Sequence, residues 1–217
     1  RWSTNFEKYT FILANPSKYF DKICKVFFPD LKYKVMPKNE SWRFAHLIVP
    51  SMSNHKDGIL SPRMPTWIRH LANLVVGQDI KQTRKIFVTR KDAENRNIKN
   101  QEELIMSLKG WETVTLEDLS IEEQVRTFAE ATHIVSPHGA GLTNLLWCRP
   151  GTKVYELTHE AFMHKKVYPS LSHHLALEHT VILCETEELK LKKPKNKKSK
   201  DMVNLKIDIP NLIKHLD

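Results

Sequence analysis

Apolar residues along the chain follow two patterns, short continuous runs and longer stretches in which they recur every three or four positions. The short runs are rich in β-branched and aromatic residues and predict strands, whereas the longer spacing predicts helices with one apolar face. The predicted strands are residues 10–13, 33–36, 44–49, 85–89, 113–116, 132–136, 153–157, 180–184 and 203–207. Because these strands alternate with helices, the pattern predicts an α/β fold with parallel sheets covered by helices.

Capping and breaking residues mark the ends of the predicted helices. Asn15-Pro16 is expected to open one helix, and Gly77 is expected to end another. Asn100 and Ser120 are each followed three residues later by glutamate, the capping-box pattern, so they predict two further helix starts. The predicted helices run from residue 16 to 27, from 63 to 76, from 100 to 109, from 120 to 129, through a short segment up to 147, and from 209 onward.

The chain is basic, with 34 Lys and Arg against 25 Asp and Glu, a formal net charge of +9. Part of the excess lies in residues 190–200, which hold seven lysines. This run predicts a solvated loop, and the alternative is attraction to an anionic substrate or membrane surface. No aromatic residue interleaves the lysines, so we expect no nucleic-acid partner.

Cysteine use and hydropathy exclude two protein classes. Cys24, Cys148 and Cys184 are odd in number and far apart, so they predict thiols rather than a disulfide framework or a zinc site. No stretch approaches the ~18 apolar residues of a membrane span. The chain begins at Arg1-Trp2 without Met, and we expect it to be a piece of a longer protein, which leaves membrane association open.

The strand predicted at 132–136 runs directly into a turn that holds Pro137, His138 and two glycines and opens a helix. Unpaired backbone N–H groups and the positive end of the helix dipole suit a phosphate at such a place. Glycine allows close approach of an anion, and histidine adds a donor that can be charged. The spacing matches neither a dinucleotide fingerprint nor a P-loop, and a diphosphate-bearing ligand is the leading interpretation. The predicted ligand-binding residues of this turn are Pro137, His138, Gly139, Ala140, Gly141, Thr143 and Asn144.

Two arginines and a glutamate extend the predicted site. Arg90 lies just past the end of a predicted strand, and Arg96 follows in the same loop. Both are expected to reach a ligand at the carboxyl edge of the sheet, where a planar guanidinium suits phosphate oxygens. The alternative is surface ion pairs with nearby acidic residues. Glu156 ends the next strand, where it is expected either to bind ribose hydroxyls or to be a solvated strand end.

Two segments taken together resemble glycosyltransferase family 61. The segments that carry the resemblance are Val88–Arg96 with Ile98 and 100–104, then Glu123-Gln124, Phe128-Ala129, Ser136–Leu146, Pro150–Thr152 and Val154–Leu157. A weaker likeness extends upstream through Leu47–Ser51 and His55 to Pro62. The resemblance implies a GT-B-like fold of two doubly wound parallel-sheet lobes. On this basis residues 1–80 are expected to form an incomplete N-terminal acceptor-side lobe and residues 81–217 a C-terminal nucleotide-sugar-binding lobe, joined near Gly77–Thr83.

The resemblance also implies an activity: transfer of a sugar from a UDP-sugar to a glycan or glycoprotein hydroxyl, with inversion, no cofactor and no essential metal. Xylose and N-acetylglucosamine are the expected sugars. The His-Trp pair that family members carry early in the N-terminal lobe is absent, so a nucleotide-sugar-binding protein without turnover is the alternative. A cytoplasmic bacterial or viral enzyme is slightly favoured over a Golgi-lumen one.

The acceptor hydroxyl needs a general base, which is expected from the N-terminal part. His55 and Asp57 are the candidates, His55 also because the family often has a histidine at this place. The alternative is a polar surface loop. A hydrolase that uses Ser136 and His138 is not expected, because no nucleophile-elbow pattern surrounds the serine. The histidines at 164, 173, 174 and 179 lack a carboxylate at metal-ligand spacing, so no metal site is expected.

Overall fold

The computed structural model describes residues 8–17, 19–49, 64–90, 97–188 and 203–216. The chain divides into two compact units, residues 1–52 and 53–217. The boundary predicted at Gly77–Thr83 falls inside the second unit, because helix α2 (Met64–Val76) packs against other elements of that unit, α4 and η3. The assignment of an acceptor-side and a nucleotide-sugar lobe stays a prediction.

The first unit holds a single strand–helix–strand motif. Strand β1 (Phe11–Ala14) pairs in parallel with β2 (Tyr33–Met36), and helix α1 (Phe20–Phe27) connects them. The helix buries Cys24 and Phe27, which share one face because they are three residues apart.

Two expectations for the first unit were wrong. The helix does not begin at Asn15-Pro16, since Asn15 has a left-handed backbone (φ 56°) and the chain turns there before α1 starts at Phe20. Residues 44–49 are not a strand, and their side chains are exposed. An apolar run alone does not make a strand when no neighbouring strand supplies hydrogen bonds.

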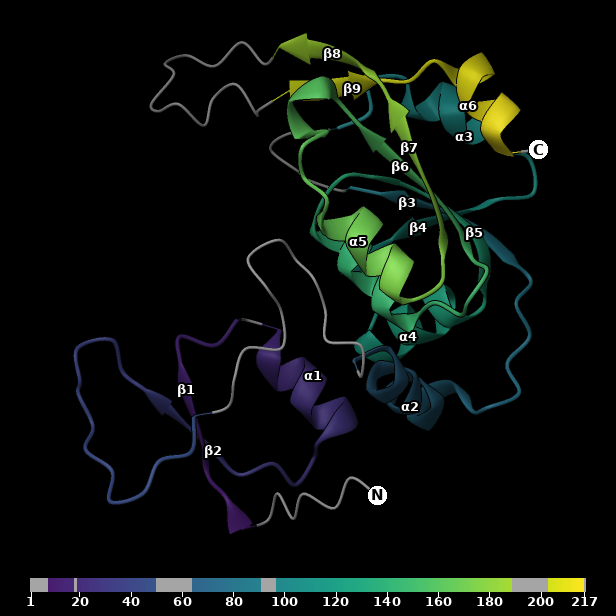
Figure 1. The fold of residues 1–217 in the computed structure, drawn as a ribbon. Helices are drawn as coiled ribbons and strands as arrows, with labels where there is room; N and C mark the ends of the chain where they lie inside the picture. Colours follow the sequence, from purple (N-terminus) through teal and green to yellow (C-terminus); the bar gives the residue numbers. More distant parts are fainter. Residues whose placement is uncertain (1–7, 18, 50–63, 91–96, 189–202, 217) are drawn as a thin grey trace. The chain divides into compact units, whose positions relative to one another are not determined.

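The second unit is built on a parallel sheet of five strands in the spatial order β4-β3-β5-β6-β7 (Figure 1). From β3 the chain moves outward to β4, crosses back to β5, and then continues outward on the other side to β6 and β7. The direction of winding therefore reverses between β3 and β5, the topological switch point of such a sheet. The strands are β3 (Arg84–Thr89), β4 (Glu112–Thr115), β5 (Ala131–Pro137), β6 (Lys153–Thr158) and β7 (Glu178–Leu183).

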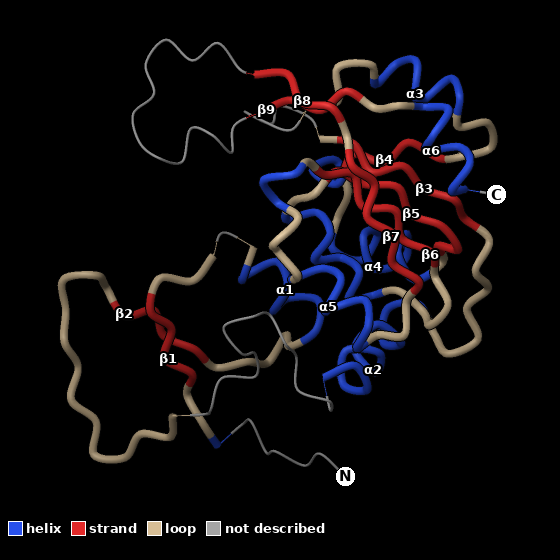
Figure 2. The backbone as a smooth tube through the Cα atoms, turned by 45° about the horizontal axis from the view of Figure 1, so that its top comes forward, coloured by secondary structure: helices blue, strands red, loops and turns tan. Residues whose placement is uncertain are grey.

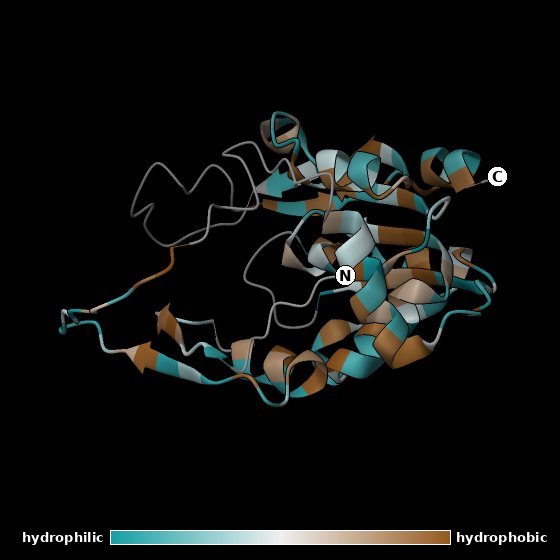
Figure 3. Ribbon diagram, turned by 60° about the horizontal axis from the view of Figure 1, so that its bottom comes forward, coloured by the Kyte–Doolittle hydropathy of each residue, from teal (hydrophilic) through white to brown (hydrophobic). Residues whose placement is uncertain are grey.

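Helices cover both faces of this sheet, as expected for a doubly wound α/β unit. In Figures 1 and 2, α4 and α5 lie on one face and α3 and α6 on the other. Colouring by hydropathy shows apolar and polar residues on the same helices, consistent with one face of each being buried (Figure 3). The helices are α3 (Gln101–Ser107), α4 (Ile121–Ala129), α5 (Val167–His174), α6 (Ile209–Leu216) and the 3₁₀ segments η2 (Leu116–Asp118), η3 (Ala140–Trp147) and η4 (Glu160–Phe162).

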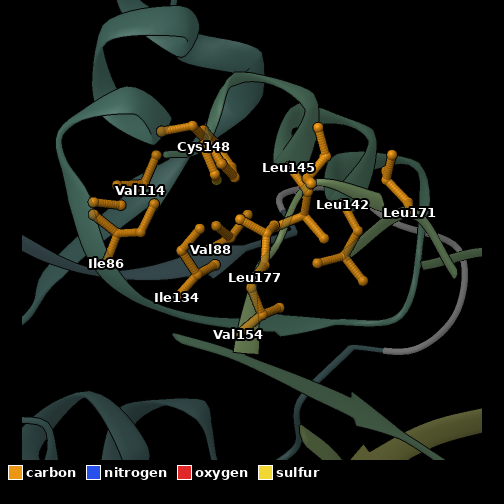
Figure 4. Packing of buried hydrophobic residues seen from close by; sticks show 13 residues of the cluster. Ile86, Val88, Val114, Ile134, Leu142, Leu145, Cys148, Val154, Leu171 and Leu177 are labelled. Carbon is orange, nitrogen blue, oxygen red and sulfur yellow. The ribbon is translucent and has the colours of Figure 1, made fainter. Parts of the chain in front are cut away.

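Successive residues of the central strands β3, β5 and β6 pack into two separate cores, one on each face of the sheet. In β3, Ile86 and Val88 belong to the cluster with η3 and α5 (Figure 4), whereas Phe87 between them belongs to the cluster with α3 and α6. Strand β5 repeats the alternation with Ile134 in the first cluster and Val135 in the second. Continuous apolar runs of this kind are therefore explained by a sheet that is buried on both faces.

The C-terminal segment is tied to the sheet unit through an asparagine. Strands β8 (Glu185–Glu188) and β9 (Val203–Lys206) form an antiparallel pair. Just after β9, the backbone of Ile207 exchanges two hydrogen bonds with the side chain of Asn100, both 2.9 Å long. Asn100 does stand at the start of α3, but its side chain makes no cap, so the capping box predicted there was wrong.

Among the described residues, no helix is long and apolar enough to span a membrane.

The capping box predicted at Ser120 is confirmed and gives a stability test. The Ser120 hydroxyl accepts from the backbone N–H of Glu123 at 3.1 Å, and the Glu123 carboxylate accepts from the N–H of Ser120 at 2.7 Å. We expect Ser120→Ala to lower the free energy of unfolding by about 1 kcal/mol, measured by urea denaturation. Ser107→Ala is the control, because the recorded hydrogen bond of this half-buried serine is within its own helix, to the carbonyl of Glu103. Equal losses in both variants would contradict the capping role.

Candidate functional site

The carboxyl edge of the sheet brings Arg90 and the turn after β5 together at the switch point. Arg90 directly follows β3, and His138 directly follows β5, its neighbour. A Cβ atom placed on Gly139 would lie 3.6 Å from both Cζ and Nη1 of Arg90. The guanidinium therefore lies beside the backbone of the turn, although almost 50 residues separate the two in sequence. The predicted neighbourhood of Arg90 and the turn is present, while their contact with a ligand stays a prediction.

The two glycines of the turn serve different purposes. Gly139 has an extended backbone (φ 166°, ψ −178°), which any residue adopts, so its small size matters only for the space beside Arg90. Gly141 faces the protein interior, where an added Cβ would lie 2.9 Å from Cδ1 of Leu116. The absence of a side chain at Gly141 therefore allows η3 to pack closely against Leu116 of η2. The sequence had suggested only close approach of an anion.

The short helix predicted after the turn is present, and it is a 3₁₀ helix. Asn144 braces it from within, since its side-chain amide donates to the carbonyl of Gly141 (3.2 Å) and its oxygen accepts from Nε1 of Trp147 (3.1 Å). Thr143 and Ala140 are exposed. Asn144 thus stabilises its own helix, and the ligand contact predicted for it stays a prediction.

Arg90 is half-buried at this edge, and burial affects its charge. Desolvation lowers the pKa of the guanidinium below its usual value, while electrostatic interactions with Glu117 and Tyr168 act in the opposite direction. A guanidinium stays protonated in proteins at neutral pH. An anion at this edge would add a favourable interaction with a cation that burial has partly desolvated.

A chain of four buried polar side chains runs inward from the turn. The Nδ1 atom of His138 hydrogen-bonds Oε1 of Glu156, whose Oε2 lies 2.8 Å from Nε2 of His179. The chain ends with a contact of 2.7 Å between Nδ1 of His179 and the hydroxyl of Ser172. Glu156 is only 2% exposed and Ser172 is fully buried, so this network lies within the protein.

Glu156 is therefore not the solvated strand end considered as one alternative. Burial acts to raise the pKa of its carboxyl group and is the largest single influence, but the hydrogen bonds and charges of His138 and His179 together outweigh it, and the pKa is lowered. Both carboxylate oxygens are taken by histidines. The ribose contact expected for Glu156 stays a prediction, whereas the contacts present give it a role in holding His138.

Aromatic rings from the segment after β6 enclose His138. Its ring centroid lies 4.9 Å from that of Phe162 in η4 and 5.2 Å from that of Tyr168 in α5. The ammonium group of Lys165 lies 3.6 Å from the centroid of Phe162, so a second cation is close to this edge. At the end of β6, the hydroxyl of Thr158 is buried and has no hydrogen-bond partner among the described residues.

Three predicted site residues lie outside the described residues. These are the two candidate bases His55 and Asp57 and the second arginine, Arg96. The lysine-rich run at 190–200 also lies outside them. Pro137, the remaining predicted residue, is the last residue of β5, where it is buried and pairs with Leu157 of β6.

The histidine group considered for a metal has other partners. His179 belongs to the buried network, and Nδ1 of His174 lies 2.7 Å from the carbonyl oxygen of Ser170, one turn earlier in α5. In the part of the chain that the structure describes, no three His, Cys, Asp or Glu side chains are grouped so that they could hold a metal ion.

Sequence reasoning missed four residues of this site: Phe162, Tyr168, Ser172 and His179. None belongs to a motif. Phe162 and Tyr168 contact His138, His179 contacts Glu156, and Ser172 contacts His179, so these contacts depend on the positions of η4, α5 and β7. The one signal was that His179 stands just before the predicted strand at 180–184, next to the strand that carries Glu156.

Proteins similar in sequence to this chain are glycosyltransferases. The sequence model of the family described as Glycosyltransferase 61 matches residues 9–155. A beta-1,2-xylosyltransferase of Oryza sativa subsp. japonica is 25% identical over 159 residues, 64% of this chain and 27% of its own length. A protein O-linked-mannose beta-1,4-N-acetylglucosaminyltransferase 2 of Xenopus laevis is 35% identical over 100 residues, 42% of this chain and 17% of its own length. The chain thus spans about a quarter or less of these relatives. Because the family match covers well over half of the chain, the protein belongs to glycosyltransferase family 61.

Proposed function

We propose that the protein transfers a sugar from a UDP-sugar to a hydroxyl group of a glycan or glycoprotein. Xylose and N-acetylglucosamine are the proposed sugars, in keeping with the names of the two relatives. The proposed reaction inverts the configuration at the sugar carbon and uses no metal. The proposed architecture is GT-B, with the nucleotide-sugar on the sheet of the second unit and the acceptor on an N-terminal lobe.

One observation carries the proposal: the guanidinium of Arg90 lies against the backbone of Gly139 at the switch point of a parallel sheet. Ligands of doubly wound proteins bind outside the carboxyl ends of the strands at this point. The proposed diphosphate lies here, between Arg90 and the first backbone N–H groups of η3, with His138 and, from the loop after Arg90, Arg96 as further donors.

The chemistry of the transfer explains why cations are needed at this edge. When the bond between the sugar and UDP breaks, negative charge develops on the leaving diphosphate. Fixed positive groups that are already in place stabilise this charge without reorganising, which is the main source of electrostatic catalysis. Arg90 and His138 are the described groups that meet this need. Lys165 is a further cation near this edge, because its ammonium group contacts the ring of Phe162, which lies beside His138.

The donor site gives a direct binding test. We expect Arg90→Ala and His138→Ala each to weaken UDP binding roughly tenfold or more, because a hydrogen bond to a charged group contributes about 1.5–3 kcal/mol. Isothermal titration calorimetry at fixed ionic strength measures the change. Arg126→Ala is the matched control, since it removes an exposed guanidinium whose recorded contacts are with Glu130 and the backbone of Val75.

Unchanged affinity in both site variants would reject the assignment of the diphosphate to this edge. If UDP binds as expected but neither sugar transfer nor hydrolysis of UDP-xylose or UDP-N-acetylglucosamine is detected, the protein is a nucleotide-sugar-binding protein without turnover.

The base that activates the acceptor is proposed to be His55. Its replacement should leave UDP affinity near normal, because the base acts on the acceptor, and should reduce turnover by about 10²–10⁴-fold. Initial rates with His55→Ala, compared with those of Asp57→Asn, measure the effect and separate the two candidates. Undiminished turnover in His55→Ala removes it from consideration.

A further inference from the structure

Hydrogen-bond valence fixes where the protons lie in the buried network. An ionised carboxylate only accepts hydrogen bonds, so both histidines must donate to Glu156, His138 through Nδ1–H and His179 through Nε2–H. In a neutral imidazole only one ring nitrogen carries a proton. Neutral His138 therefore has a bare lone pair at Nε2, which repels a phosphate oxygen instead of binding it.

The serine at the far end distinguishes the two histidines. The Ser172 hydroxyl is fully buried, and His179 Nδ1 is its recorded hydrogen-bond partner among the described residues. Donation of the hydroxyl proton to Nδ1 satisfies both groups only when His179 is neutral, because a protonated His179 would donate to Ser172 and leave the hydroxyl proton without an acceptor. The structure records no hydrogen bond of His138 Nε2 with a described residue. His138 is therefore the histidine that can gain a proton without losing a bond.

We propose that His138, Glu156, His179 and Ser172 form a relay that couples donor binding to the uptake of one proton at Nε2 of His138. The added proton, taken from solvent, turns Nε2 into a charged donor to a diphosphate oxygen. The negative charge of Glu156 stabilises the imidazolium through the hydrogen bond at Nδ1, on the other side of the ring from Nε2. His179 and Ser172 are positioning residues, which orient the carboxylate and stay neutral so that its charge acts on His138. This inference rests on the proposed donor site and names further residues on which the site depends.

The groups around His138 are consistent with one charge change at this position. Glu156 of β6 is the carboxylate that contacts its ring, and Tyr168 of α5 and Phe162 of η4 contact the ring through their aromatic faces or edges. Arg90, after β3, lies beside the next residue, Gly139. This guanidinium disfavours a positive charge on His138, and a bound diphosphate relieves the repulsion. Proton uptake is thus expected on ligand binding rather than before it.

Calorimetry on the 217-residue chain tests the proposal. UDP is titrated at a pH of about 8, where its terminal phosphate is ionised, in two buffers of matched ionic strength and different ionisation enthalpy. The relay predicts uptake of up to about one proton per UDP bound and an affinity that falls as pH rises from this value. His138→Gln should bind more weakly, with no uptake and a flat pH profile.

Two variants examine the relay behind His138. Glu156→Gln keeps the shape of the side chain and removes its charge, so UDP affinity should fall roughly tenfold near neutral pH. Ser172→Ala should shift the pH profile of UDP affinity to lower pH, because His179 then shares the charge of Glu156. Ser170→Ala, on the same helix, is the control and should leave the profile unchanged.

The outcomes separate the inference from the proposed function. UDP binding that depends on Arg90 but is accompanied by no proton uptake overturns the relay and leaves the donor site standing. No UDP binding by the wild-type chain overturns both. A Ser172→Ala profile that coincides with the wild-type profile removes the positioning role of Ser172 and His179. Thermal unfolding of each variant identifies loss of folding, and the wild-type measurement tests the relay even if Glu156→Gln fails to fold.

Discussion

The parallel pairing of β3 with β5 is the constraint on which the site depends. Ile86 pairs with Ile134 and Phe87 with Val135, so the two strands run side by side and end at the same edge of the sheet. Residues that follow them, Arg90 and His138, must therefore emerge together. The pairing is fixed by burial on both faces: a shift by one residue would move every apolar side chain of the strand to the opposite core. The position of the arginine is thus a consequence of how the core packs.

The buried carboxylate of Glu156 imposes a second constraint. Burying a charge is costly unless it is fully hydrogen-bonded, and Glu156 meets this condition through one histidine on each oxygen. Removal of either histidine would leave part of the charge uncompensated. The turn after β5 is therefore held to β6, β7 and α5 by a network that tolerates few alternatives. A loop fixed in this way keeps its donors in place before a ligand arrives, which is what electrostatic catalysis requires.

Much of the second unit could be predicted from the sequence because its signals are local. The apolar runs located β3, β5 and β6 to within a residue or so, the Ser120–Glu123 pattern located the start of α4, and the turn after β5 was recognised from its composition. Predictions failed where a distant partner decides. Asn100 has the sequence signature of a cap, but its side chain pairs with Ile207, more than a hundred residues away. Propensity cannot anticipate a contact of this kind.

The relay shows why the rest of the site could not be found from spacing. Glu156 stands on β6, which lies between β5 and β7 in the sheet. A carboxylate on the middle strand can present one oxygen to each side. Here the partners are His138, just after the carboxyl end of β5, and His179, near the amino end of β7. In sequence the three are separated by loops and a helix, and nothing in the intervals marks them as a set. Only the strand order makes them neighbours. The same order places the arginine after β3 next to the histidine after β5. The groups proposed to bind the anion and the groups proposed to set the protonation state of His138 therefore follow from one topology.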